Sequence, residues 1–241
     1  MRRYTSPEEH AFFPDRLPNT SGDLPPLDYP TDLLSSKGGA CFINYNSVLL
    51  KRYINEIVPS ITTRGDDEQH GSTVISDLAV LQALSRRCHY GKFVAESKYR
   101  DNPAGYQALV EAGNVDGVWE LLTNMTVEKK VLRRARLKAA TYGREPLLST
   151  LPAIEGNDNT SIVAAAAASA VVAAIEAMGE EKEKEMGKID PTLIESIYRD
   201  VIIPLTKDIE VAYLFLRCGK PVPDRLSPAD TSTLITVNGN A

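Results

Sequence analysis

Helical periodicity is the feature of this sequence that most restricts its fold. Apolar residues recur every three or four positions before Pro59, and they do so again from Asp77 to about Tyr99. No stretch of the sequence alternates apolar and polar residues with the two-residue repeat of a half-buried strand. The sequence therefore predicts an all-α protein.

Turn and cap residues divide this helical chain. Residues 62–72, which are polar and rich in glycine and acids, are predicted to form a loop, and residues 100–105, with their Asn-Pro pair, end the helix before them. A short and then a long helix are predicted to follow, the long one closed by Gly143. Another helix is predicted to begin near Pro191, and a last one around Pro204 ends near Gly219.

Composition restricts the class of protein. A chain of 241 residues with 43% apolar content can bury a core, and a net charge of −5 gives no overall cationic field for nucleic acid or an anionic membrane. The 14-residue apolar run 162–175 is too short for a bilayer, and residues 1–10 lack the apolar core of a secretory signal. Three distant cysteines, without metal-type spacing, are expected to be inert thiols: Cys41, Cys88 and Cys218. We expect a cytoplasmic protein without a metal site.

The domain prediction is one helical domain over residues 1–220 and a flexible tail over residues 221–241. Residues 1–40, with several prolines, are expected to lie extended over the core. An Ala-rich insertion at about 154–187 is predicted to form an extra helix, packed into the bundle or against a second subunit. The alternative is a poorly ordered low-complexity insert.

Two cations share one helical face in the segment 84–100. Arg87 and Lys98 are eleven residues apart, which is almost three turns and about 16 Å along one continuous helix. Small or aliphatic residues on the same face leave a shallow space for a small dianion: Gly91, Val94 and Ala95. The alternative is that both cations pair with neighbouring acids. Three further cations are expected to be solvated: Arg86, Lys92 and Arg100.

Two carboxylates on apolar helical faces add to this pattern. Glu128 follows Asn124 by four residues, and Glu210 follows Thr206 by the same spacing. Because burying a bare charge is expensive, such a carboxylate must be paired, protonated or functional. Together with the two cations, these residues predict a polar pocket inside a helical bundle.

Three segments resemble, in the same order, those of the eukaryotic, all-helical chorismate mutases: LSRRCHYGKFVAESKY (84–99), LLTNMTVEKKVLRRARLKAATYG (121–143) and YRDVIIPLTKDIEVAYL (198–214). Residues 2–17 and 54–72 are also similar to that family. The resemblance implies a helical bundle of the same type. It also implies isomerisation of chorismate to prephenate in phenylalanine and tyrosine biosynthesis, without a cofactor, a metal or a covalent intermediate.

The resemblance also implies roles for the polar residues. Arg87 would bind a substrate carboxylate, and Lys98 would bind a carboxylate and the ether oxygen of the bond that breaks. Asn124 and Glu128 would serve the side of the ring hydroxyl, and Thr206 would serve a carboxylate.

Glu210 would face the same ether oxygen and must be protonated to donate to it. Its apolar neighbours favour the protonated form. We therefore predict faster turnover below neutral pH.

An effector site for an aromatic amino acid is a further implication, as is a homodimer. The arginine pair and the glycine-serine element of that site match Arg2, Arg3, Gly71 and Ser72. Three neighbouring positions depart from the family pattern: Glu68, Gln69 and Ile75.

The N-terminal part of the family pattern is missing from the resemblance. The family has a long first helix with another carboxylate-binding arginine, whereas the likeness here begins at Arg2 and no residue matches that arginine. We expect the Ala-rich helix to take the place of that wall. Two other readings stay open: a shortened homologue recruited to another small-molecule or pericyclic step, and an inactive homologue that binds a ligand or a partner.

Overall fold

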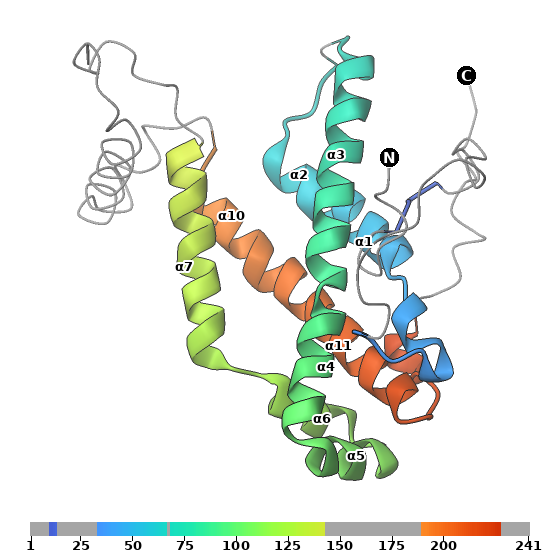
Figure 1. Cartoon of the computed structure of the whole chain (residues 1–241). Coiled ribbons are helices and arrows are strands. Elements are labelled where there is room, and N and C mark those ends of the chain that lie inside the picture. The colour runs from blue at the N-terminus through green and yellow to red at the C-terminus, as the bar shows by residue number, and fades with distance from the viewer. Residues whose placement is uncertain (1–9, 14–32, 67, 143–188, 228–241) are drawn as a thin grey trace, which may run out of the picture. The chain divides into compact units, whose positions relative to one another are not determined.

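The computed structural model describes residues 10–13, 33–66, 68–142 and 189–227, and all regular elements in these ranges are helices (Figure 1). This confirms the predicted all-α class. None of the helices in the described ranges is long and apolar enough to cross a membrane. The chain divides into two compact units, one of residues 1–123 with 202–241 and one of residues 124–201.

The first unit is built around one buried helix, α11, which packs against α3, α4, α5, α6 and η3. Ile209, Val211 and Tyr213 of α11 have no exposed surface. The bounds of the helices in this unit are η3 Lys37–Phe42, α1 Asn46–Arg52, η4 Tyr53–Ile57, α2 Val58–Ile61, α3 His70–His89, α4 Gly91–Asp101, α5 Pro103–Glu111, α6 Val115–Leu122, α11 Ile203–Arg217 and η6 Asp224–Leu226.

The predicted helix from Asp77 to Tyr99 is two helices in the structure. The first, α3, begins at His70, within the segment predicted as a loop, and one residue, Tyr90, separates it from α4 while keeping helical backbone angles. At this junction, the amide of Phe93 bonds to the Tyr90 carbonyl in a tight turn, at 3.1 Å. Gly91 follows directly, and its missing side chain lets α4 approach α11 closely.

Helix ends in the first unit follow the local chemistry, with two departures from prediction. The helical path continues beyond Pro59, because the π-helical turn η4 leads directly into α2. Pro59 lies in the first turn of α2, where its missing backbone N–H is tolerated. The single short helix predicted before the long one is a pair, α5 and α6. Their first turns are capped by Asn102 and Asn114, whose side chains accept from the amides of Gly105 and Gly117.

The second unit pairs the long helix α7 (Met125–Tyr142) with α10 (Pro191–Ile197), and the π-helical turn η5 (Tyr198–Ile202) follows. The predicted start near Pro191 is confirmed, because Asp190 caps α10 by accepting from the amide of Thr192 at 2.9 Å. Arg136 of α7 forms an ion pair with Glu195 of α10 at 3.8 Å. Gly143 and the Ala-rich insertion lie outside the described residues.

The start of the predicted tail is packed. Leu226 is buried, its carbonyl accepts from the hydroxyl of Tyr45, and Arg225 forms an ion pair with Asp116 at 2.6 Å. Residues 221–227 therefore belong to the first unit rather than to a flexible extension.

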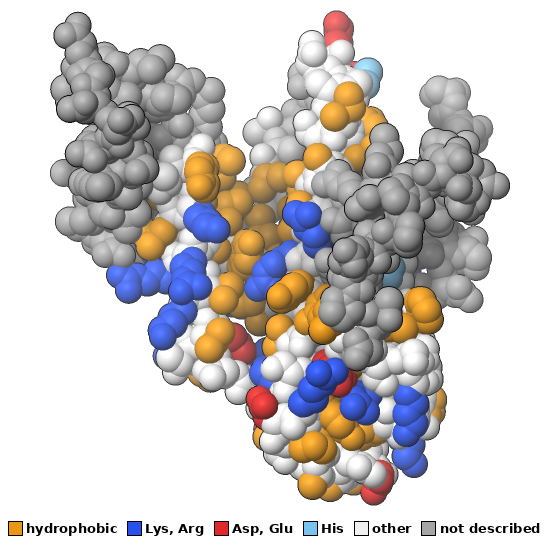
Figure 2. Space-filling model, in the orientation of Figure 1, with side chains coloured by type: hydrophobic (Ala, Val, Ile, Leu, Met, Phe, Trp, Pro, Cys, Tyr) orange, Lys and Arg blue, Asp and Glu red, His pale blue; other side chains and the backbone are white. Residues whose placement is uncertain are grey.

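Hydrophobic side chains are exposed along the N-terminal half of α3 (Figure 2). Ile75, for example, is 72% exposed.

Candidate active site

A close contact between α4 and α11 forms the centre of the candidate site. A Cβ atom added to Gly91 would lie 2.9 Å from Cγ2 of Thr206 and 3.1 Å from Cγ of Glu210. Thr206 and Glu210 are both buried there. The sequence paired these two residues with each other, and the structure adds that both lie against the start of α4.

This contact corrects the predicted empty floor between Arg87 and Lys98. Gly91 and Ala95 are buried, and α11 fills the space beside Gly91. Arg87 lies in the last turn of α3 and Lys98 in the last turn of α4, with Tyr90 between the two helices.

Arg87 and Lys98 lack acidic partners within the part of the chain that the structure describes. The guanidinium of Arg87 is exposed, and the ammonium of Lys98 is half-buried and donates to the carbonyl of Leu122. Arg100, on the same helix as Lys98, is instead paired with Glu96 at 2.9 Å. The alternative that both same-face cations are neutralised by neighbouring acids therefore fails among the described residues, and a bound anion could pair with either cation.

The buried carboxylate of Glu210 affects its surroundings. The phenol of Tyr106 has a raised pKa, first because it is buried and second because the ionised form of Glu210 would repel a phenolate nearby. Thr206 donates its hydroxyl to the carbonyl of Ile202 at 2.6 Å and lies beside the thiol of Cys88. Burial raises the pKa of that thiol to about 11, which agrees with the predicted inert cysteine.

Asn124 and Glu128 belong to the second unit. Asn124 precedes α7 and caps it, with its side-chain oxygen accepting from the amide of Val127 at 3.1 Å. Glu128 is half-buried in the first turn of α7. Their predicted meeting with the residues of the first unit stays a prediction.

Comparisons with known proteins agree with this geometry. The family model described as chorismate mutase type II matches residues 71–211. The chain belongs to this family. It is 37% identical over 215 residues to chorismate mutase 1, chloroplastic, from Arabidopsis thaliana, with 89% of this chain and 56% of that protein covered. The chain thus spans little more than half the length of this relative.

Two solved structures of chorismate mutases are also similar. The Aro7p chorismate mutase from Candida albicans, in complex with L-Trp, has a TM-score of 0.67 and 34% identity, covering 94% of this chain and 72% of that one. AtCM1 with phenylalanine bound in its allosteric site has a TM-score of 0.65 and 35% identity, covering 88% of this chain and 70% of that one. The predicted family resemblance and bundle type are therefore confirmed.

The effector residues predicted from the family pattern are described only in part. Gly71 and Ser72 lie exposed in the first turn of α3, not in a loop, and the hydroxyl of Ser72 donates to the carbonyl of Gln69 at 2.9 Å. Arg2 and Arg3 lie outside the described residues.

The prediction that Lys92 is solvated is wrong. Lys92 has no exposed surface, and its ammonium donates to the carbonyls of Cys41 at 2.9 Å and Ile43 at 3.3 Å and lies 3.1 Å from Nε2 of His10. Within the described residues, these groups offset part of the cost of burying the ammonium. They are backbone and imidazole groups far away in sequence, so the residues around Lys92 do not predict its burial.

Sequence reasoning also missed Glu96, which is buried and hydrogen-bonded across helices. A signal was available, because Glu96 and Arg100 form an i, i+4 pair. Arg100 is therefore paired, although it was predicted to be a simple solvated cation.

Proposed function

We propose that this chain is a chorismate mutase that rearranges chorismate to prephenate in the biosynthesis of phenylalanine and tyrosine. The observation that carries the proposal is the buried pair Thr206 and Glu210 at the α3–α4 junction, with Arg87 and Lys98 as cations without acidic partners in the described chain. Membership of the chorismate mutase type II family supports the same reaction.

The proposed reaction is intramolecular. As the ether carbon–oxygen bond breaks, a carbon–carbon bond forms within the same molecule, so no group leaves and no oxidant is needed. Arg87 and Lys98 hold the two carboxylates and so favour the compact conformer in which the reacting carbons meet. Lys98 and protonated Glu210 donate to the ether oxygen, where negative charge develops.

Two residues near the start of α7 are also given roles in this proposal. Asn124 and Glu128 are proposed to receive the ring hydroxyl, with the side-chain amide of Asn124 available as donor even while its oxygen caps α7. Their assignment is supported by the family pattern around residues 121–143. A change of Asn124 to Asp would test it, with a weaker apparent affinity for chorismate expected.

Regulation by an aromatic amino acid is proposed through Arg2, Arg3, Gly71 and Ser72. The relatives bound to L-Trp and to phenylalanine support an amino acid as effector. The first turn of α3 offers amide donors for a carboxylate, in the region of Gly71 and Ser72. Tryptophan, tyrosine and phenylalanine, each titrated against the initial rate, would reveal the effector, and a rate that none of the three changes would refute the proposal.

A homodimer and a cytoplasmic location are further proposals. The exposed hydrophobic residues of α3, Val74 and Ile75 among them, support an interface between two copies (Figure 2). Light scattering of the purified chain tests the dimer. Fluorescence microscopy of a tagged full-length chain tests the location, for which the chloroplastic relative is the competing precedent. The single domain over residues 1–220 with an extra Ala-rich helix likewise stays a proposal.

The deciding experiment follows the ultraviolet loss of chorismate with the purified chain and identifies prephenate as the product. Arg87→Ala should lower the rate about a hundred- to a thousandfold, because a charge-assisted contact to the substrate is lost. Lys129→Ala, which removes an exposed cation of α7, is the matched control and should keep the rate. A folded chain without turnover would refute the proposal and direct the search to another small-molecule reaction or a binding role.

A further inference from the structure

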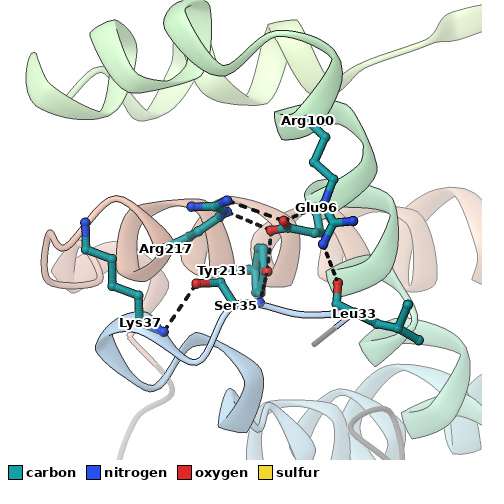
Figure 3. Close-up of polar contacts among 7 residues, drawn as sticks. All are labelled: Leu33, Ser35, Lys37, Glu96, Arg100, Tyr213 and Arg217. Atoms are coloured by element: carbon teal, nitrogen blue, oxygen red, sulfur yellow. Dashed lines mark hydrogen bonds and ion pairs between the residues drawn. The ribbon is translucent and has the colours of Figure 1, made fainter. Parts of the chain in front are cut away.

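Glu96 is a buried carboxylate that joins α4 to α11 (Figure 3). It accepts from the hydroxyl of Tyr213 at 2.6 Å and from Nε of Arg217 at 2.7 Å, both on α11. Nε of Arg100, one turn further along α4, donates to its other oxygen at 2.9 Å. The side chain of Glu96 is 5% exposed, so water competes little for these bonds.

Each partner of Glu96 is itself held by a second contact. The hydroxyl of Tyr213 accepts from the amide of Ser35 at 2.9 Å, and Arg100 donates to the carbonyl of Leu33 at 3.2 Å (Figure 3). The guanidinium of Arg217 lies over the ring of Tyr99, 3.9 Å from its centroid. The carboxylate therefore has little freedom to choose another geometry, and α4 is tied to one rotation about its axis.

The Glu96 carboxylate stays charged in this setting. Burial acts to raise its pKa, but the hydrogen bonds from Arg217, Tyr213 and Arg100 outweigh burial and lower it. At neutral pH it is an acceptor for all three donors, so the connection between the two helices is complete in the working range of the protein.

The position of this connection matters for the candidate site. Glu96 precedes Lys98 by two residues on α4, and Tyr213 follows Glu210 by one turn on α11. The close contact at Gly91 sets the separation of the same two helices. Gly91 and Lys92 hold the start of α4, and Glu96 adds a polar connection to α11 close to Lys98, which restricts the direction of Lys98.

We propose that Glu96 is a positioning residue that orients Lys98 relative to Glu210 through Tyr213 and Arg217. This inference rests on the proposed function, in which Lys98 and Glu210 act on the same ether oxygen. Displacement of one from the other weakens stabilisation of the transition state more than binding of the ground state, because the charge on that oxygen appears only as the bond breaks.

The test compares Glu96→Gln with Asp77→Asn in the full chain. Asp77 accepts a hydrogen bond from Tyr53 at 2.6 Å, so the control also removes the charge from a carboxylate that links two helices, but away from α4 and α11. Glu96→Gln should lower kcat about ten- to a hundredfold with KM changed less than threefold. Asp77→Asn should keep kcat within twofold. Equal kcat values for the two variants would overturn the inference.

A second, milder variant tests the route through Tyr213. Tyr213→Phe removes one donor and leaves the ion pair of Glu96 with Arg217 in place, and we expect a three- to tenfold fall in kcat. In the Glu96→Gln background, the same change should cost less than twofold, because the connection is already broken. Additive losses would show that Tyr213 acts independently of Glu96 and would overturn the proposed route.

Hydrogen exchange separates failure of this inference from failure of the proposed function. Amides in the last turn of α4 should exchange at least tenfold faster in Glu96→Gln than in Asp77→Asn, whether or not chorismate reacts. If the unmodified chain has no mutase activity, the proposed function fails. Equal exchange in Glu96→Gln and Asp77→Asn would then also reject the connection of α4 to α11 through Glu96. An active chain with equal exchange and an unchanged kcat would reject the positioning role alone.

Discussion

Gly91 lies so close to Thr206 that a single added carbon would stand 2.9 Å from the Thr206 methyl group. We predict that Gly91→Ala lowers the free energy of unfolding by about 1–3 kcal/mol, because α4 and α11 must separate to admit the methyl group. It should also lower kcat, since Thr206 and Glu210 lie at this contact. Urea unfolding and initial rates measure both effects.

The matched control is Gly71→Ala in the first turn of α3, where a Cβ atom meets nothing within 4 Å. That change should leave stability unaltered or raise it by up to about 1 kcal/mol, because alanine is the better helix former. Gly91→Ala as stable as Gly71→Ala would show that the α4–α11 contact tolerates a side chain.

The sequence predicted features that depend on residues close together in the chain and missed those that depend on residues far apart. The all-α class and the start of α10 at Asp190 and Pro191 depend on local periodicity and capping, so they were predictable. The close approach of α11 to Gly91 was not predictable in this way, because Thr206 is more than a hundred residues away in sequence.

The same limit applies to the site. Arg87, Lys98, Thr206 and Glu210 were identified by family pattern, and the structure places Thr206 and Glu210 together at Gly91. Whether a charged residue is buried depends on distant groups, and for Lys92 these are backbone carbonyls, which carry no sequence signature.

Lys92 provides a second stability prediction. Lys92→Met keeps the length of the side chain but removes the donor to the carbonyls of Cys41 and Ile43, and we expect a loss of about 2–4 kcal/mol in the free energy of unfolding. Lys129→Met, at an exposed position of α7, should change it by less than about 0.5 kcal/mol. Chemical denaturation of both variants makes the comparison, and similar midpoints would mean that the buried ammonium contributes nothing.

From the burial of His89 we predict a loss of folding stability in acid. Burial lowers its pKa to about 3, with His10 and Lys92 adding to the effect, whereas the unfolded chain takes up the proton near pH 6.5. Between these values the unfolded state binds more protons, so stability is complete above pH 6.5 and falls as the pH falls. From pH 7 to pH 5 the contribution of His89 should fall by about 2 kcal/mol.

The hydrogen bonds of His89 explain why the neutral ring is needed. Its Nε2 accepts from the amide of Tyr45 at 2.9 Å, and its Nδ1 lies 2.8 Å from the carbonyl of Ser85, to which it donates. His89→Gln should flatten the pH dependence measured by urea titration, whereas His70→Gln, at an exposed position, should keep it. If His89→Gln loses as much stability between pH 7 and pH 5 as the unmodified chain, other groups cause the loss.

For Asp208 we predict the opposite dependence of stability on pH. Burial raises its pKa to about 6, although Arg52 and Arg225 act to lower it. The folded state therefore binds the extra proton between pH 4 and 6, and the ionised form destabilises the protein above that window. Asp208→Asn should be more stable than the unmodified chain at pH 7 by about 1–2 kcal/mol, after allowance for residual solvent screening, and equal to it near pH 4.

The control for Asp208 is Asp116→Asn, because Asp116 is exposed and also lies beside Arg225. Its stability at pH 7 should match that of the unmodified chain within about 0.5 kcal/mol. A destabilised Asp208→Asn at pH 7 would show that attraction to the two arginines outweighs burial.

Glu210 predicts the pH dependence of the reaction itself. Its carboxylate is 6% exposed and must carry a proton to donate to the ether oxygen, so kcat should fall as the pH rises above neutral and the proton is lost. Glu210→Gln has a permanent donor of nearly the same shape and should keep its activity at alkaline pH, with a flat profile from pH 5 to 8. Initial rates of chorismate loss at saturating substrate over that range measure both profiles. A rate that climbs steadily from pH 5 to 8 in the unmodified chain would remove Glu210 from the role of donor and leave Lys98 as the cation at that oxygen.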